Sequence, residues 1–215
     1  MGSKNKMTIN CPVVVAVEGR DYFYMLLSQL CDAPEFQEVQ LWDWADSKYS
    51  LSAGLEVLVK MPAFQRKQVR ALGIIRDAEQ DRTATETSLR ESLRANGLGI
   101  PATQMEATRD NPHVGYLIVP HDKPSGCLEN ACLDASTLVS GHVACAEDFL
   151  QSVSPYHEPP LNANYQAKLK VHALIAGSGK NPAMTLGESA LAGLWDFKRE
   201  SIKVMLDFIR LMRDA

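Results

Sequence analysis

Residues 13–21 read VVVAVEGRD, and residues 72–81 read LGIIRDAEQD. Each stretch begins as an apolar strand and ends in acidic side chains. A carboxylate buried without a partner costs stability, so acids at the ends of buried strands usually serve a function. If the two strands are parallel neighbours, their carboxyl ends meet at one edge of a sheet, where ligands bind. We therefore predict that Glu18, Asp77 and Glu79 surround one point there, as ligands of a divalent metal ion.

The elements around these stretches predict the fold class. Short segments that are continuously apolar or alternating predict strands at 12–17, 37–43 and 68–76. Apolar residues that recur on one helical face predict helices at 21–31, 51–61 and 83–96. Such alternation is typical of a parallel sheet with helices on its faces. We therefore predict an α/β fold with a mostly parallel central sheet, flanked by helices.

The second half of the chain departs from this alternation. Segments 103–107 and 114–120 flank a turn-rich connection, which suggests an antiparallel or edge pair. Beyond the loop-like segment 154–164 the pattern is helical, and the last helix has one apolar stripe. We therefore expect an α/β core over 1–153 and a helical C-terminal cap over 154–215, packed together as one compact unit.

The composition limits the class of protein. The chain has 215 residues, of which 46% are hydrophobic and 22% charged, as in an ordinary globular domain. No apolar run approaches the roughly 20 residues that a membrane helix needs, so no membrane partner is expected. Five scattered cysteines and the lack of a charged-then-apolar leader predict a cytoplasmic protein. The net charge of −4 excludes a basic nucleic-acid coat but permits a local basic strip.

The two acidic stretches resemble the motifs of the Toprim domain, which occurs in topoisomerases, primases, small ribonucleases and nucleases of the overcoming-lysogenisation-defect type. Residues 17–21 (VEGRD) are similar to its first motif, a strand that ends in Glu-Gly. Residues 77–79 (DAE) are similar to its Asp-x-Asp motif, with Glu79 in place of aspartate. Residues 73–81 more closely resemble a bacterial Toprim-like family of unknown function, and residues 120–129 (PHDKPSGCLE) loosely match a further segment of that family.

This resemblance implies roles for particular residues. Glu18 and Asp77 would be catalytic, with Glu18 as a general acid or base. One or two Mg²⁺ or Mn²⁺ ions would be held by five candidate ligands: Glu18, Asp77, Glu79, Asp81 and Glu129. Arg20 and Lys123 lie next to acidic positions, where cations would hold a substrate phosphate. The structural alternative is that the acids cap helices or lie in solvated turns.

Two functions remain open at this point, besides a weaker third option, a phospho-acceptor receiver with Asp77 at a strand end. The first is a metal-dependent nuclease, or another phosphotransfer enzyme acting on nucleic acid, in which the metal activates water. The second is a non-catalytic metal-binding or regulatory module that acts with a partner protein. The retained Glu18, Asp77 and Glu79 favour the first. The second is favoured by Tyr22, which stands where many Toprim proteins have an acid, and by glutamate rather than aspartate at position 79.

Other patterns have plainer explanations. Four residues approximate a zinc-binding pattern: Cys127, Cys132, His142 and Cys145. Their spacing is poor, and cysteines of this kind more often serve as small buried hydrophobic residues. Trp42 and Trp44 alternate on a predicted strand, so we expect them in the core rather than stacked on nucleic-acid bases.

Overall fold

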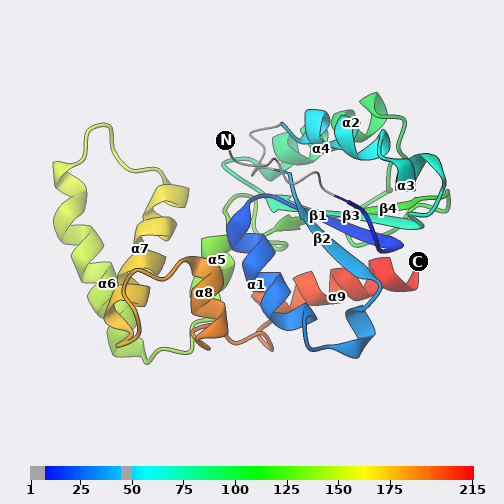
Figure 1. Cartoon of the computed structure of the whole chain (residues 1–215). Helices are drawn as coiled ribbons and strands as arrows, with labels where there is room; N and C mark the ends of the chain where they lie inside the picture. The colour runs from blue at the N-terminus through cyan, green and yellow to red at the C-terminus, as the bar shows by residue number, and fades with distance from the viewer. Residues whose placement is uncertain (1–7, 45–49) are drawn as a thin grey trace, which may run out of the picture.

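The computed structural model of the chain describes residues 8–44 and 50–215. Its centre is a four-stranded sheet in the order β2-β1-β3-β4 (Figure 1). The strands are β1 (Val13–Val17), β2 (Val39–Asp43), β3 (Ala71–Asp77) and β4 (His113–Val119). All three neighbouring pairs are parallel. A parallel sheet flanked by helices is consistent with a Toprim-like α/β fold and confirms the predicted fold class.

Helices cover both faces of the sheet. One face is covered by α1 (Arg20–Leu30) and α9 (Glu200–Asp214), and the other by α2 (Leu51–Val59), α3 (Pro62–Gln65) and α4 (Arg82–Ala95). The central strand β1 contributes to both cores, because successive side chains of a strand point to opposite faces. Val13, Val15 and Val17 enter the core with α1 and α9, whereas Val14 and Ala16 enter the other. All five side chains are fully buried, which explains the uninterrupted apolar run.

The last helix, α9, lies close against the sheet because two adjacent strands present glycines to it. Gly73 of β3 and Gly115 of β4 are register partners. An added Cβ at Gly73 would lie 3.0 Å from Phe208 and from Met212 of α9, and one at Gly115 would also meet Met212. The apolar stripe predicted for this helix is confirmed, with all of its members buried: Ile202, Met205, Leu206, Ile209 and Met212.

The remaining helices lie beyond the carboxyl ends of the strands. They are α5 (Leu128–Asp134), α6 (Ser140–Val153), α7 (Ala163–Gly177) and α8 (Leu186–Leu191), and the short 3-10 turns are η1 (Pro34–Phe36) and η3 (Ser154–Tyr156). The hairpin of α6 and α7, yellow in Figure 1, projects from the body, and α7 packs along α5. Within the described parts of the chain, no helix is long and apolar enough to cross a membrane.

One topological expectation, an antiparallel or edge pair, is confirmed only in part. The strand predicted at 114–120 is β4, which lies at the edge of the sheet but pairs in parallel with β3. The antiparallel contact with 103–107 is local: an isolated bridge joins Ala107 and Gly115, and the N–H of Met105 donates to the carbonyl of Tyr116 at 3.1 Å. The physical reason is that α4 returns the chain to the amino-terminal edge of the sheet, so the next strand runs in the same direction as β3.

Candidate functional site

The carboxyl ends of three neighbouring strands each have an acidic residue. Val17, the last residue of β1, is the register partner of Asp43 in β2 and of Ile75 in β3. Glu18 directly follows β1, and Asp77 ends β3. These ends lie on the side of the sheet that faces α5 and α7 (Figure 1). The parallel topology thus brings together acids that are far apart in the sequence, as predicted from the strand pattern.

Glu18 is held by the neighbouring strand. Its Oε2 accepts a hydrogen bond from the backbone N–H of Asp77 at 3.2 Å and lies 3.4 Å from Nε of Arg76. Burial raises the pKa of Glu18, although Arg76 acts in the opposite direction. Gly19 then turns the chain directly into α1, with a φ of 96° that favours glycine, and its N–H donates to Oδ1 of Asp43 at 3.0 Å.

Asp77 lies at the centre of the acidic side chains. Its Oδ1 accepts hydrogen bonds from the hydroxyl of Tyr22 at 2.6 Å and from the backbone N–H of Leu128 at 2.8 Å. Burial raises the pKa of Asp77 to about 8; the hydrogen bond from Tyr22 opposes this, and the nearby charges of Glu18 and Glu129 add to it. Tyr22 is therefore a hydrogen-bond donor to Asp77.

Two further carboxylates reach this region, one from a loop and one from the first turn of α5. Glu79 follows β3 in the left-handed conformation, with a φ of 57°, and forms an isolated antiparallel bridge with Gly126. Its Oε2 accepts a hydrogen bond from Nδ2 of Asn164 at 3.2 Å. Glu129 lies in the first turn of α5, and its charge contributes to the raised pKa of Asp77. We name the set of Glu18, Asp77, Glu79 and Glu129 the acidic edge.

Other predicted site residues have different contacts. Asp81 caps α4, because its Oδ1 accepts hydrogen bonds from the backbone N–H groups of Thr83 at 2.8 Å and Ala84 at 3.2 Å. The ammonium group of Lys123 pairs with Asp134. Arg20 is the exposed first residue of α1. The capping role anticipated as the structural alternative thus applies to Asp81, and Lys123 is already paired.

The structure adds a cation that the sequence reasoning missed. Partial burial alone would lower the pKa of Lys168 on α7, but the charges of Glu129, Asp77 and Glu79 contribute to raising it. Lys168 follows Glu129 by nearly forty residues and belongs to no acidic motif, so the sequence offered no signal for it. Asp43 was also missed, although it shares with Glu18 and Asp77 the position at a strand end.

The chemistry of the donor set fits a hard divalent cation. Carboxylate oxygens are the ligands that Mg²⁺ prefers, and this ion keeps several waters, so one or two carboxylates suffice. Within residues 8–44 and 50–215, no hydrogen-bond donor reaches Oδ2 of Asp77 or Oε1 of Glu18. In the same residues, no group of three or more His, Cys, Asp or Glu side chains is arranged to hold a metal. The arrangement therefore fits a hydrated ion on two carboxylates better than a full set of protein ligands.

The zinc-like pattern is dispersed in the fold. Cys127 and Cys132 are buried at α5, as expected for small hydrophobic residues. His142 and Cys145 lie on α6, where they line an apolar hollow of about 330 Å³ shared with α7. The residues that line this hollow include no member of the acidic edge. Trp42 and Trp44 are buried in the core with α2 and α4, which confirms their predicted packing role.

The chain matches a model of a protein family. A family model described as "Protein of unknown function (DUF3226)" covers residues 12–214, nearly the whole chain. The matched region begins just before β1 and reaches the last turn of α9, so it includes all four strands and the acidic edge. No curated protein and no solved structure matches the chain.

Proposed function

We propose, from the premise that the chain belongs to the DUF3226 family, that its acidic edge binds Mg²⁺ or Mn²⁺ and promotes hydrolysis of phosphodiester bonds in nucleic acid. One observation carries the proposal: Glu18 and Asp77 converge at the carboxyl ends of adjacent parallel strands, where Glu18 accepts a hydrogen bond from the backbone of Asp77. The proposal includes a relation to Toprim proteins, supported by the VEGRD and DAE motifs at these strand ends.

The charge balance of the acidic edge supports a cation there. Among the described residues, the four carboxyl groups of the acidic edge have Arg76 and Lys168 as nearby basic side chains. The pKa values of Glu18 and Asp77 are both raised, with burial as the main cause. A divalent ion would stabilise the charged forms of such carboxyl groups. Carboxyl groups with shifted pKa values that lie close together are typical of functional sites.

The residues of the acidic edge and their partners would have different roles in this reaction. Tyr22 and the N–H of Leu128 hold Oδ1 of Asp77, which would leave Oδ2 to bind a ligand. Arg76 and the N–H of Asp77 hold Glu18, the candidate general acid or base. A bound divalent ion would supply polarisation of a phosphoryl oxygen and a lowered pKa of water.

A second candidate function is a non-catalytic metal-binding or regulatory module that acts with a partner protein. Tyr22 favours it, because the hydroxyl occupies Oδ1 of Asp77 at a position where many Toprim proteins supply another acid. The two functions share the metal site and differ in whether phosphodiester bonds are cleaved.

The test of cleavage uses the full chain with single-stranded DNA, duplex DNA and RNA in Mn²⁺ or Mg²⁺. We expect products with at least one substrate, and no products in EDTA or with Asp77→Asn. Asp81→Asn is the matched control, because asparagine caps a helix as well as aspartate does. Cleavage that is equal in wild type and Asp77→Asn would mark a contaminant. Metal binding without cleavage of any substrate would favour the regulatory module.

A further inference from the structure

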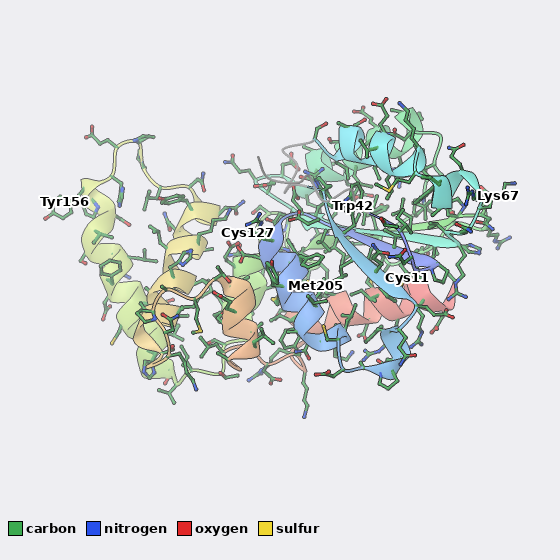
Figure 2. The ribbon with its side chains drawn as sticks, in the orientation of Figure 1. Cys11, Trp42, Lys67, Cys127, Tyr156 and Met205 are labelled. Carbon is green, nitrogen blue, oxygen red and sulfur yellow. The ribbon has the colours of Figure 1, made fainter. Side chains whose placement is uncertain are left out.

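The first turns of α7 lie against the acidic edge. Nδ2 of Asn164 donates to Oε2 of Glu79 at 3.2 Å, and the carbonyl of Asn164 accepts from the thiol of Cys127 at 3.9 Å. Cys127 is the residue that precedes α5, which contains Glu129. Figure 2 places Cys127 at the inner side of the α6–α7 region and Tyr156 at its outer end. The amino-terminal end of α7 is thus part of the rim of the site.

One face of α7 that starts at this contact contains an aromatic ring, a cation and an imidazole. Tyr165, Lys168 and His172 follow Asn164 by one, four and eight residues, which places all four within one side of a helix. Tyr165 is 49% exposed, and Lys168 and His172 are exposed as well. We name these four residues the α7 strip.

The other sides of α7 are already occupied. Ala167, Val171 and Leu174 are buried in the body of the protein. Lys170 pairs with Glu147 of α6, so this lysine serves the α6–α7 hairpin. Lys168, two residues earlier, instead experiences the charges of Glu129 and the other acids. Lys170 is therefore paired within the hairpin, whereas Lys168 lies on the side of α7 that also carries Asn164, the residue bonded to Glu79.

We infer that the α7 strip is the surface along which a single-stranded nucleic acid enters the acidic edge, with Lys168 on a backbone phosphate and Tyr165 stacked on an unpaired base. The inference rests on the proposed function for its substrate class and adds the strand type and two binding residues. Lys168 would thus bind the substrate phosphate, the role that the sequence suggested for Lys123. The ammonium group of Lys123 is paired with Asp134.

The chemistry of the strip favours a single strand over a duplex. An exposed tyrosine ring can stack on a base only if the base is unpaired and outside a duplex stack. A lysine contacts phosphates of either form, but a net charge of −4 disfavours the overall basic coat that attracts a duplex backbone. One cation beside one aromatic ring is the combination that single-strand grooves use.

The test measures binding of three fluorescent probes by anisotropy: a short DNA strand, the RNA strand of the same sequence and the DNA duplex. The full-length protein is used, once in Ca²⁺ and once in EDTA. We expect a single strand to bind more tightly than the duplex. Lys168→Met should weaken single-strand binding about 5-fold or more and reduce the salt slope by about 0.7, the value for one phosphate. Tyr165→Leu should weaken it about 5-fold or more through lost stacking.

Matched controls come from the same protein. Lys170→Met removes a lysine from α7 that does not face the acids, and Tyr24→Leu removes a tyrosine of α1 that is also 49% exposed. Both controls should bind the single strand as wild type does. Equal losses in Lys168→Met and Lys170→Met would overturn the inference, as would a duplex preference or the absence of binding to all three probes.

Failure of this inference can be told apart from failure of the proposed function. Mn²⁺ binding and cleavage are measured on wild type and Lys168→Met in parallel. If wild type binds the single strand through the α7 strip but neither binds Mn²⁺ nor cleaves, the nuclease proposal fails and the strand surface stands. If wild type binds Mn²⁺ and cleaves while Lys168→Met and Tyr165→Leu bind and cleave normally, the strand surface is wrong and the metal site stands.

Discussion

Two polar clusters in this protein contrast in how fully hydrogen bonds satisfy their charged groups. One is the acidic edge, where four carboxyl groups crowd the ends of β1 and β3. The other lies between α4 and β4, and we name it the arginine cluster; its members are Arg82, Glu86, Arg90, Gln104 and Tyr116. Both clusters are partly buried, and each contains a buried tyrosine that donates a hydrogen bond to a carboxylate.

The arginine cluster satisfies its own groups. Arg82 donates to the carbonyl of Lys123 at 2.7 Å, to Oε1 of Gln104 at 3.2 Å and to the carbonyl of Pro120. These bonds fasten the loop that leads from β4 to α5. Tyr116 donates to Glu86, which also faces Arg90. The two guanidinium groups are therefore held by one carboxylate and by several neutral acceptors within the cluster, as expected of a structural network.

The acidic edge is unbalanced by comparison, and this difference separates a structural cluster from a candidate functional one. Burial disfavours the charged forms of Glu18 and Asp77, so these residues cost stability in the absence of a cation. Residues that lower the stability of a protein in this way are usually kept because they serve its function. The contrast predicts opposite responses to mutation: neutralising the acidic edge should abolish activity and spare stability, and disrupting the arginine cluster should do the reverse.

The largest expected effect is on catalysis. Asp77→Asn and Glu18→Gln should each lower metal-dependent cleavage on the order of 100-fold or more, because each removes a charged oxygen from the proposed metal site. Initial rates at saturating Mn²⁺ provide the measurement. Asp81→Asn should cleave at the wild-type rate, since its aspartate caps α4. A rate loss in Asp81→Asn as large as in Asp77→Asn would break the distinction between the two acids.

The second effect is on stability in the arginine cluster. Arg82→Met should lower the free energy of unfolding by about 2–3 kcal/mol, because Gln104 and several carbonyls lose their donor. Urea denaturation measures this change. Arg94→Met, an exposed position on the same helix, should stay within about 0.5 kcal/mol of wild type. A loss in Arg82→Met no larger than in Arg94→Met would remove the structural role assigned to this cluster.

The third effect is the pH dependence of stability without metal. The pKa of Asp77 rises from its ordinary value of 3.8 to about 8 in the folded protein. The folded state therefore binds this proton more tightly than the unfolded state does, so the free energy of unfolding falls as pH rises from about 4 through 8. Asp77→Asn lacks this titration and should be more stable than wild type at pH 8 in EDTA, by roughly 1–3 kcal/mol.

Chemical denaturation at several pH values measures this difference, and Mg²⁺ should reduce it by favouring the charged form of Asp77 in the wild type. Parallel stability curves for wild type and Asp77→Asn across this range would show that Asp77 is not the crowded carboxyl described above.

The smallest effect compares the two tyrosines. Tyr22→Phe and Tyr116→Phe each remove one hydroxyl that donates to a carboxylate, and each should cost about 1 kcal/mol of stability. Only Tyr22→Phe should also change the cleavage rate, because its partner Asp77 belongs to the proposed metal site. Equal rates for the two variants would place Tyr22 outside the catalytic arrangement.

Much of the fold could be predicted because the local signals agree with the tertiary structure. The apolar run at residues 13–17 and the apolar stripe on α9 are both buried. Buried positions take apolar residues, so the sequence alone reveals them. The pairing of β4 could not be predicted in the same way. Turn residues before it suggested a local antiparallel pair, but the direction of a strand depends on where α4 returns the chain.

The candidate site was predictable where it depends on strand ends and unpredictable where it depends on packing. Glu18 and Asp77 were found because parallel strands end at the same edge of the sheet. Asp81 was included because it continues the acidic run, whereas its side chain caps a helix. Lys168 was missed because only the packing of α7 on α5 brings it to the acids.

The most direct test of the central claim is a calorimetric titration of Mn²⁺ into the metal-free protein, repeated with Asp77→Asn, Glu18→Gln and Asp81→Asn. The unbalanced acidic edge predicts saturable binding to wild type and to Asp81→Asn, and its loss in the other two variants. Mn²⁺ binding that is absent from wild type, or unchanged in Asp77→Asn and Glu18→Gln, would contradict a metal site at the ends of β1 and β3.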